Sequence, residues 1–330
     1  MSRSTGLALL TMLVLVSAFL AASPGLQARP GSDYPESRVR WYITDMAVDD
    51  DGSIYVMDHE SNNVIRLDKD GNLIWRTPLT SPDGAKLDAW NMHLVDQPQK
   101  ALVIGLLTGM WALTPDGKIS LLVPPSRHYA DTIAAASSNG LLYVLDTERN
   151  QVIVRSRKAT TQTDSPSSQP DAANTVADPP QTTDAFTSKM VIDGNVQGPA
   201  HFGRPRKVRV NKSGTVIWIL DQSFTFNVFD GSGKFIREIT PPDKKHRSFT
   251  YVYGLAFDSD GNAYVACTET HCILKYDQNG NLVRTIPGIW GNAFAIGPDG
   301  GLYYADGYHG IVTKLDKNGR RLKEIRLPGS

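Results

Sequence analysis

The sequence carries no excess of charge of either sign: 34 lysines and arginines stand against 34 aspartates and glutamates in 330 residues. Proteins that bind nucleic acids or anionic membranes usually carry a basic excess, so no nucleic-acid partner is predicted. Cysteine is almost missing as well, and the two that occur form neither a CxxC motif nor part of a second pair. Beyond the N-terminal region, no segment is apolar enough to span a membrane. The remaining composition, 41% hydrophobic and 21% charged, is that of a globular protein with a large core.

One long apolar run is present, and it lies at the N-terminus. Arg3 precedes an apolar stretch over residues 7–22, which is followed by a helix-breaking Pro-Gly pair and the small residue Ala28. This order is typical of a secretory signal peptide, so residues 1–28 are predicted to be removed, with cleavage after Ala28 or after Ala22. The protein is accordingly predicted to be secreted or periplasmic. The alternative is a retained membrane anchor, and only an uncleaved segment would bring the chain to a membrane.

Glycine is spaced regularly, because four times a turn glycine is followed nineteen residues later by another. The pairs are Gly52 and Gly71, Gly214 and Gly233, Gly261 and Gly280, and Gly300 and Gly319. Around each pair, short runs of alternating apolar residues are separated by Asp/Gly turns, which indicates a meander of four short strands. Alignment of the repeat gives six units, near residues 41–80, 88–126, 129–195, 203–242, 251–288 and 290–328.

Six such units in tandem predict an all-β fold: a six-bladed β-propeller of four-stranded antiparallel blades over residues 41–330, preceded by a lead at residues 29–40. A single unit cannot bury both faces of its sheet, whereas six units around an axis bury them between neighbours. The third unit is interrupted at residues 159–187 by a stretch rich in Ser, Thr and Pro, with almost nothing to bury. We predict that this insertion is disordered and that the fourth strand of the unit resumes near Lys189.

The fourth unit resembles a known repeat. The segment GPAHFGRPRKVRVNKSGTVIWILDQSFTFNVFDGSGKFIREI at Gly198–Ile239 is similar to the NHL repeat, in which a Pro-containing lead precedes Val-x-Val, a turn glycine and further aliphatic strands. Units 1, 5 and 6 match nearly as well, the third in its first half, and the second poorly. The resemblance implies a six-bladed propeller. It implies little about function, because NHL propellers include binding platforms, extracellular scaffolds and a few enzymes.

The resemblance also gives positions for a candidate site. NHL-type propellers include the peptidylglycine amidating lyases, whose zinc histidines lie just ahead of a first strand. The corresponding positions here hold no histidine; they are Thr44, Asn91, Thr132, Arg206, Tyr253 and Asn292. The lyase metal site is therefore not expected. These side chains are predicted to line the channel mouth, and the residues one step outward are Tyr42, Arg204, Tyr251 and Trp290. A polar ring under an aromatic and arginine rim suits a polar or anionic small molecule or a peptide.

The fourth unit departs from the others in its first strand, where Arg206, Lys207 and Arg209 occupy positions that are small or polar elsewhere. The first unit places Asp45 at the position equivalent to Lys207, and units 1 and 4 face each other across a six-membered ring. Buried cations need a counter-charge. We expect Asp45 and neighbouring acids to supply it; the alternative is a bound anion.

Most histidines are predicted to gather on one side of the ring. His59, His271 and His309 lie between the second and third strands of units 1, 5 and 6, which are neighbours in a closed ring. Three converging imidazoles would bind zinc, whereas the plainer interpretation is that exposed loops hold polar residues. The Asp-rich turns at residues 49–52 and 258–261 resemble parts of calcium loops but lack the downstream glutamate, so they are interpreted as turns. No cofactor is expected, and zinc or calcium are the candidates if one binds.

Four aspartates end second strands at equivalent places: Asp58, Asp146, Asp221 and Asp306. A residue repeated in most blades is expected to cap a loop with its carboxylate rather than to act in catalysis. The two cysteines, Cys267 and Cys272, flank a four-residue loop between two strands of unit 5. They could face each other across a hairpin, and a disulfide between them would suit an oxidising compartment.

These patterns predict an exported NHL-like propeller that serves as a binding or scaffold module, without chemistry of its own. Its partner would be a protein or a polar or anionic small molecule or peptide at the channel mouth. The alternative is a propeller enzyme, a metal-assisted hydrolase or lyase, acting at the same face. An enzyme needs converging acid, base or metal groups, whereas a binding module needs an apolar and aromatic patch.

Overall fold

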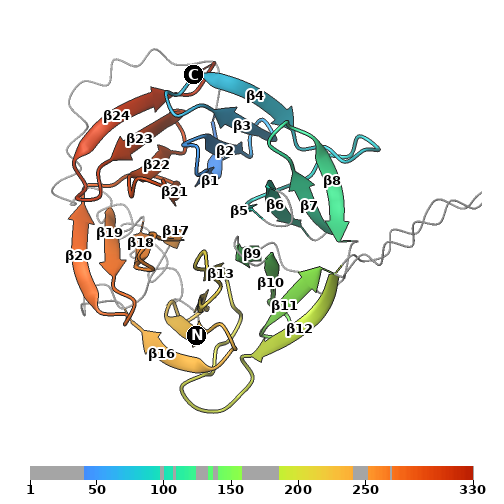
Figure 1. Ribbon diagram of the computed structural model, residues 1–330, viewed down its shortest axis with the longest axis vertical. Helices are drawn as coiled ribbons and strands as arrows, with labels where there is room; N and C mark the ends of the chain where they lie inside the picture. The colour runs from blue at the N-terminus through green and yellow to red at the C-terminus, as the bar shows by residue number, and fades with distance from the viewer. Residues whose placement is uncertain are drawn as a thin grey trace, which may run out of the picture. The chain divides into compact units, whose positions relative to one another are not determined.

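The computed structural model describes residues 41–96, 100–106, 109–123, 133–136, 140–157, 186–240, 252–267 and 270–329. All regular structure in these ranges is β-strand, arranged as six four-stranded antiparallel sheets. Each sheet is one blade of a β-propeller, with its strands in sequence order from the centre outward (Figure 1). The predicted fold class is therefore confirmed. Within the described ranges, no helix has the length and hydropathy to cross a membrane.

The strand bounds follow the repeat. Blade 1 holds β1 (Ile43–Val48), β2 (Ile54–Asp58), β3 (Asn63–Leu67) and β4 (Leu73–Pro78). Blade 2 holds β5 (Met92–Val95), β6 (Ala101–Leu106), β7 (Gly109–Leu113) and β8 (Ile119–Val123). Blade 3 holds β9 (Ile133–Ala136), β10 (Leu141–Asp146), β11 (Gln151–Arg157) and β12 (Phe186–Asp193). Blade 4 holds β13 (Lys207–Val210), β14 (Val216–Leu220), β15 (Phe226–Asp230) and β16 (Phe235–Ile239). Blade 5 holds β17 (Val252–Phe257), β18 (Ala263–Cys267), β19 (Cys272–Tyr276) and β20 (Leu282–Pro287). Blade 6 holds β21 (Ala293–Ile296), β22 (Leu302–Asp306), β23 (Ile311–Leu315) and β24 (Arg321–Arg326).

The paired glycines form the hairpin turns that set this pattern. All eight have φ between 72° and 91°, the left-handed region that only glycine enters without strain. Within each pair, the first glycine turns the chain between the first and second strands of its blade, and the second turns it between the third and fourth. The nineteen-residue spacing is thus the distance between two turns at the same edge of one blade.

The core is divided into six hydrophobic clusters, each between two neighbouring blades. For example, Met46 and Val48 of β1 pack toward blade 6, and Leu255 of β17 packs toward blade 4. The innermost strands contact one another around the ring in the order β1, β5, β9, β13, β17, β21 and back to β1. Burial of sheet faces against neighbours, which the repeat predicts, is what holds the blades together.

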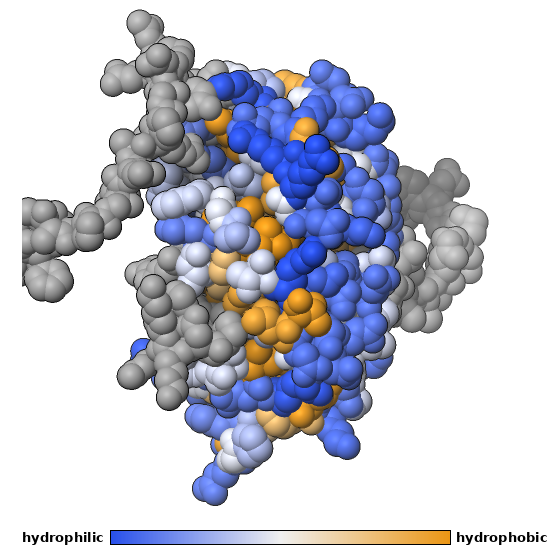
Figure 2. All heavy atoms as spheres, turned by 90° about the vertical axis from the view of Figure 1, so that its left-hand side faces the viewer, coloured by the Kyte–Doolittle hydropathy of each residue, from blue (hydrophilic) through white to orange (hydrophobic). Residues whose placement is uncertain are grey.

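The ring closes without exchange of a strand between its first and last blades. Trp41 and Ile43 are buried in the cluster that joins blade 1 to blade 6. Two side-chain hydrogen bonds add to the junction: Arg76 donates to the Pro328 carbonyl at 2.8 Å, and Lys323 donates to the Asp70 carbonyl at 2.7 Å. Figure 2 views the side of the molecule that blades 5 and 6 form, and most of that surface is hydrophilic.

Blade 3 differs from the prediction at its fourth strand. The predicted insertion falls between β11 and β12, but β12 begins at Phe186, three residues ahead of the expected Lys189. Residues 186 and 187 therefore belong to the strand, because they continue the pairing with Arg157 and Ser156. Residues 158–185 lie outside the described ranges, as do residues 1–40 with the predicted signal peptide and lead.

Candidate functional site

The propeller has two faces that differ in what they present. The first strands of all blades begin at one face, here called the entry face, which also carries the loops between second and third strands. They end at the other face, here called the exit face, which carries the glycine turns. This follows from the alternation of strand direction within an antiparallel blade.

Aromatic side chains from three adjacent blades meet on the entry face. Tyr42, at the start of blade 1, lies with its ring centroid 5.8 Å from those of His59 and Trp90 and 6.0 Å from that of Tyr308. His59 and Trp90 are themselves 4.1 Å apart. Trp90 and Tyr308 remain 42% and 59% exposed. We call these four residues the rim cluster. Tyr42 and His59 were candidates from the sequence, whereas Trp90 and Tyr308 were not, because the equivalent positions in the other blades hold no aromatic residue.

A second aromatic pair lies on the same face between blades 5 and 6. His271 stacks on Trp290 with ring centroids 3.4 Å apart and an interplanar angle of 19°. Trp290 is half exposed, as expected for a rim residue. The Nδ1 atom of His271 is buried and has no hydrogen-bond partner in the structure.

The repeated aspartates hold the entry-face loops in place. The buried Asp58 carboxylate accepts a hydrogen bond from the Tyr42 backbone N–H at 2.9 Å and one from the Ser61 hydroxyl. Asp146, Asp221 and Asp306 likewise accept backbone N–H donors of the loops that follow them. The predicted capping role is therefore confirmed. Its consequence is that Tyr42 is fixed by the strand end of its own blade.

The three histidines do not converge. Among the described residues, the only group of His, Cys, Asp or Glu with ligand atoms within 4.8 Å of one another is Asp49, Asp50 and Asp96. Instead, the His59 Nδ1 atom lies 3.6 Å from an Asp88 carboxylate oxygen, and the His309 Nδ1 atom lies 2.9 Å from Asp306. His59 and His309 thus each lie beside a carboxylate, whereas His271 stacks on Trp290, and the hypothesis that the three histidines share a zinc ion is corrected accordingly.

On the propeller axis, Asp45 and Arg209 form a buried ion pair between blades 1 and 4, with Nη2 and Oδ2 3.4 Å apart. The same carboxylate accepts the backbone N–H groups of Met46 and Met92, each at 2.9 Å. This is the internal pairing that the sequence analysis expected. Lys207 lies beside the pair and donates to the Tyr253 carbonyl at 3.1 Å. Burial and the neighbouring Arg209 lower the pKa of Lys207 to about 8, and Asp45 opposes the shift.

The other predicted mouth residues are spread apart. Arg206 lies over the Phe224 ring at 4.8 Å, and Arg204 lines a shallow entry-face hollow with Thr147, Glu148 and Asn150. Tyr253 packs between blades 5 and 6, where burial raises its pKa above the usual range. Asn292 donates its backbone N–H to the Ala305 carbonyl at 2.9 Å. Tyr251 and Thr132 lie outside the described residues.

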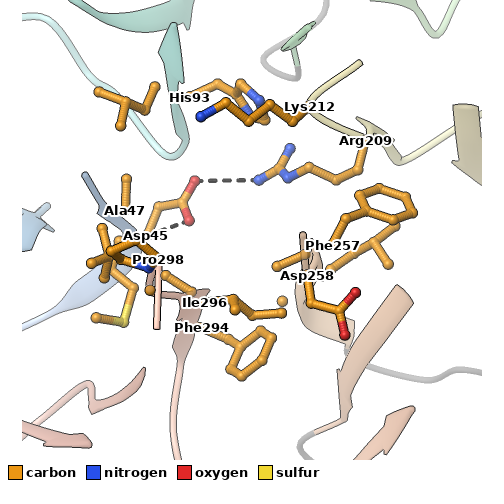
Figure 3. Close-up of a pocket in the computed structure, with 18 of the residues that line it drawn as sticks. Asp45, Ala47, His93, Arg209, Lys212, Phe257, Asp258, Phe294, Ile296 and Pro298 are labelled. Atoms are coloured by element: carbon orange, nitrogen blue, oxygen red, sulfur yellow. Dashed lines mark hydrogen bonds and ion pairs between the residues drawn. The ribbon is translucent and has the colours of Figure 1, made fainter. Parts of the chain in front are cut away.

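A cavity of about 310 Å³ opens on the exit face, opposite to the predicted mouth. Asp45 and Arg209 meet across its inner end, and Lys212 lies beside them (Figure 3). Asp50 and Asp96 also line the cavity. The wall is apolar, with side chains from the ends of first strands and the residues that follow; these include Leu94, Leu255, Phe257, Phe294, Ile296 and Pro298. Arg209 therefore faces the exit-face pocket and not the entry face. The sequence could not predict this direction, because the direction of a side chain on an inner strand depends on how the blades pack.

The acidic residues around this pocket are paired with lysines. Lys212 lies 3.0 Å from Asp50 and 3.6 Å from Asp96, and Lys100 lies 2.5 Å from the buried Asp49. Asp258 accepts backbone N–H groups within its own turn and lies 3.2 Å from Lys275. The Asp-rich segments are turns with lysine counter-ions, as interpreted from the missing glutamate.

The predicted disulfide is not formed. Cys267 and Cys272 are directly opposite each other in the β18–β19 pairing, but both are free buried thiols. Burial raises the pKa of Cys267 to about 12, so the thiol form is strongly favoured. The Cys272 sulfur lies 2.9 Å from the Thr270 hydroxyl.

A model of the NHL repeat matches residues 249–276, which span the first three strands of blade 5. This part of blade 5 is therefore similar to an NHL repeat. No curated protein sequence gives a significant match. Among solved structures, selenomethionine-substituted virginiamycin B lyase from Staphylococcus aureus is 13% identical with a TM-score of 0.54, over 88% of this chain and 87% of that one. A streptogramin B lyase is 14% identical with a TM-score of 0.52, over 88% and 86%.

A catalytically inactive variant of the Staphylococcus aureus virginiamycin B lyase, solved with quinupristin, is 14% identical with a TM-score of 0.50, over 87% and 85% of the two chains. At this identity the likeness shows the fold alone. The six-bladed propeller described above and these lyases share an architecture, which by itself does not assign a site or an activity.

Proposed function

We propose that the protein is a binding module whose entry face recognises a protein or peptide partner through the rim cluster. The observation that supports this is the contact between Tyr42, His59, Trp90 and Tyr308, which come from three adjacent blades, while Trp90 and Tyr308 stay exposed. Aromatic residues supply large contact area at low conformational entropy and dominate the energetics of many interfaces. An exposed group of them is a common mark of an interaction site.

The rim cluster is held in a fixed geometry before any partner arrives. The Tyr42 backbone N–H is bound by the buried Asp58 carboxylate, and the Tyr308 N–H is bound by Asp306. Pre-organised side chains lose less entropy on binding, which raises affinity for a given contact area. Acidic residues nearby, Asp88 and Asp306, would favour a partner with basic groups beside its apolar contact. Export of the protein remains a prediction from its N-terminal segment.

The proposal is tested with a phage-displayed library of random peptides selected against the immobilised full-length protein. The affinities of selected peptides are then compared for the wild type and the double variant Trp90→Ala/Tyr308→Ala. We expect the double variant to bind at least about tenfold more weakly, because truncation of an aromatic hot spot typically costs more than 1 kcal/mol.

The matched control is Val283→Ala/Leu322→Ala, which removes two exposed apolar side chains from the outer strands of blades 5 and 6. It should bind the peptides like the wild type. Selection of no peptide, or equal binding by the rim variant, would refute the role of the rim cluster. Mass spectrometry of the bound peptides tests the alternative that the protein is an enzyme. Conversion of a peptide to a product would favour that alternative.

A further inference from the structure

We propose that the exit-face pocket binds a small zwitterion with an apolar side group, such as a free amino acid or a dipeptide. The ligand carboxylate would meet Arg209 at the inner end, and its ammonium group would lie toward the aspartates at the mouth. This site is distinct from the rim cluster on the opposite face and does not depend on the proposed function.

The inner end of the pocket is positively charged. Two cations, Lys207 and Arg209, lie near the Asp45 carboxylate, and the Arg209 side chain is only 8% exposed. The Asp45 carboxylate is divided among Arg209 and two backbone N–H groups. Arg209 Nη2 contacts Asp45 and Nη1 donates to the Val208 carbonyl at 3.1 Å, and the same guanidinium lines the cavity. Its fixed positive charge and several N–H groups suit a ligand carboxylate.

The mouth carries the opposite charge. Asp50 and Asp96 share the single ammonium group of Lys212, at 3.0 and 3.6 Å. Asp258 also lines the cavity, and its labelled carboxylate lies on the side away from Lys212 (Figure 3). Asp258 pairs with Lys275 at 3.2 Å, so three carboxylates at the mouth stand against the ammonium groups of Lys212 and Lys275. This excess of one negative charge favours an entering group of positive charge over a purely anionic ligand.

The wall between the two charged ends is apolar. Phe257, Phe294 and Ile296 lie together on one side of the cavity, across from His93 and Lys212 (Figure 3). Burial of an apolar group here would add roughly 25 cal/mol per Å² removed from water. The volume of about 310 Å³ is at the small end of known ligand pockets, which fits an amino acid or dipeptide rather than a larger molecule.

The test is isothermal titration calorimetry of the full-length protein with four probes: L-phenylalanine, glycyl-L-phenylalanine, 3-phenylpropanoate and 2-phenylethylamine. The last two keep the phenyl group and its two-carbon chain but carry only the anion or only the cation. We expect saturable binding of at least one zwitterion, and binding at least about tenfold weaker for both single-charge analogues, since each lacks one charge-assisted contact.

The matched protein variant is Asp45→Asn/Arg209→Gln, which replaces the ion pair by neutral groups of similar size. It should weaken zwitterion binding at least about tenfold, while Arg284→Gln, on the outer strand β20, should not change it. If the double variant does not fold, Phe257→Ala and Asp96→Asn take its place, and each should weaken binding. Failure of both zwitterions to bind, equal binding of a single-charge analogue, or indifference of folded pocket variants would overturn the proposal.

Discussion

A half-buried lysine on the propeller axis shows how one side chain couples the interior to solution pH. Desolvation of Lys207 and the nearby positive charge of Arg209 both disfavour its charged form. Its pKa in the folded state is about 8, against 10.5 for an exposed lysine. The unfolded chain therefore binds a proton at Lys207 between pH 8 and pH 10.5 that the folded chain has released.

This difference predicts that the contribution of Lys207 to the free energy of unfolding is lowest below pH 8 and rises with pH up to about 10.5. The slope reaches at most about 1.4 kcal/mol per pH unit. Urea unfolding of the wild type and of Lys207→Met at pH 7.5, 8.5 and 9.5 measures it, and the stability of the wild type should increase relative to that of the variant. Buried tyrosines affect both proteins alike above pH 10. A constant difference across this range would contradict the low pKa.

At the scale of elements, aspartate carboxylates at the ends of second strands stabilise the loops that follow by accepting their backbone N–H groups. Asp58 is fully buried and caps the loop that follows β2. Its carboxylate also accepts the backbone N–H of Tyr42, the residue that directly precedes β1. Strand pairing alone does not determine the oxidation state of Cys267 and Cys272. The two cysteines lie opposite each other in a hairpin, as predicted, yet they are free thiols in the structure.

We predict that Asp58→Ala lowers the free energy of unfolding by about 1–3 kcal/mol, because it leaves a buried N–H donor without its acceptor. Chemical denaturation of the variant measures the loss. The control is Asp70→Ala, which removes an exposed turn carboxylate that pairs with the exposed Lys69, and it should change stability far less. Equal effects of the two substitutions would show that the capping bond is not what stabilises the loop.

At the scale of the whole molecule, closure of the ring joins the two ends of the described chain. Each blade is built from consecutive strands, so no strand covalently connects blade 6 back to blade 1. The junction depends on side-chain packing instead, with Trp41 buried among residues of both blades. This interface differs from the other five because no inter-blade loop crosses it.

Trp41→Ala is therefore predicted to lower the free energy of unfolding by about 3–5 kcal/mol, since a large buried side chain is removed at the only interface without a connecting loop in the described propeller. Trp90→Ala, which truncates an exposed tryptophan, should change it little. Thermal and urea unfolding followed by circular dichroism compare the two. A small effect of Trp41→Ala would indicate that backbone and polar contacts suffice to close the ring.

Much of this protein was determined by its sequence. The spacing of turn glycines predicted six four-stranded blades, because a backbone position with positive φ restricts the residue type locally. The alternation of apolar residues likewise identified the faces that pack between blades. The capping aspartates and the Asp45–Arg209 pairing followed from equivalent positions in the repeat, as did the absence of histidine from the lyase positions.

The tertiary structure decided what the repeat could not. The exit-face pocket and the rim cluster combine side chains from three or more blades, and their geometry depends on the rotation between blades. The repeat does not predict that Trp90 and Tyr308 contact Tyr42, so their approach is visible only in three dimensions. The same holds for the histidines: His59, His271 and His309 share a face by topology, yet their ring nitrogens do not converge. Periodic residues are fixed by local backbone geometry, whereas a site built across blades is fixed by packing over the whole ring.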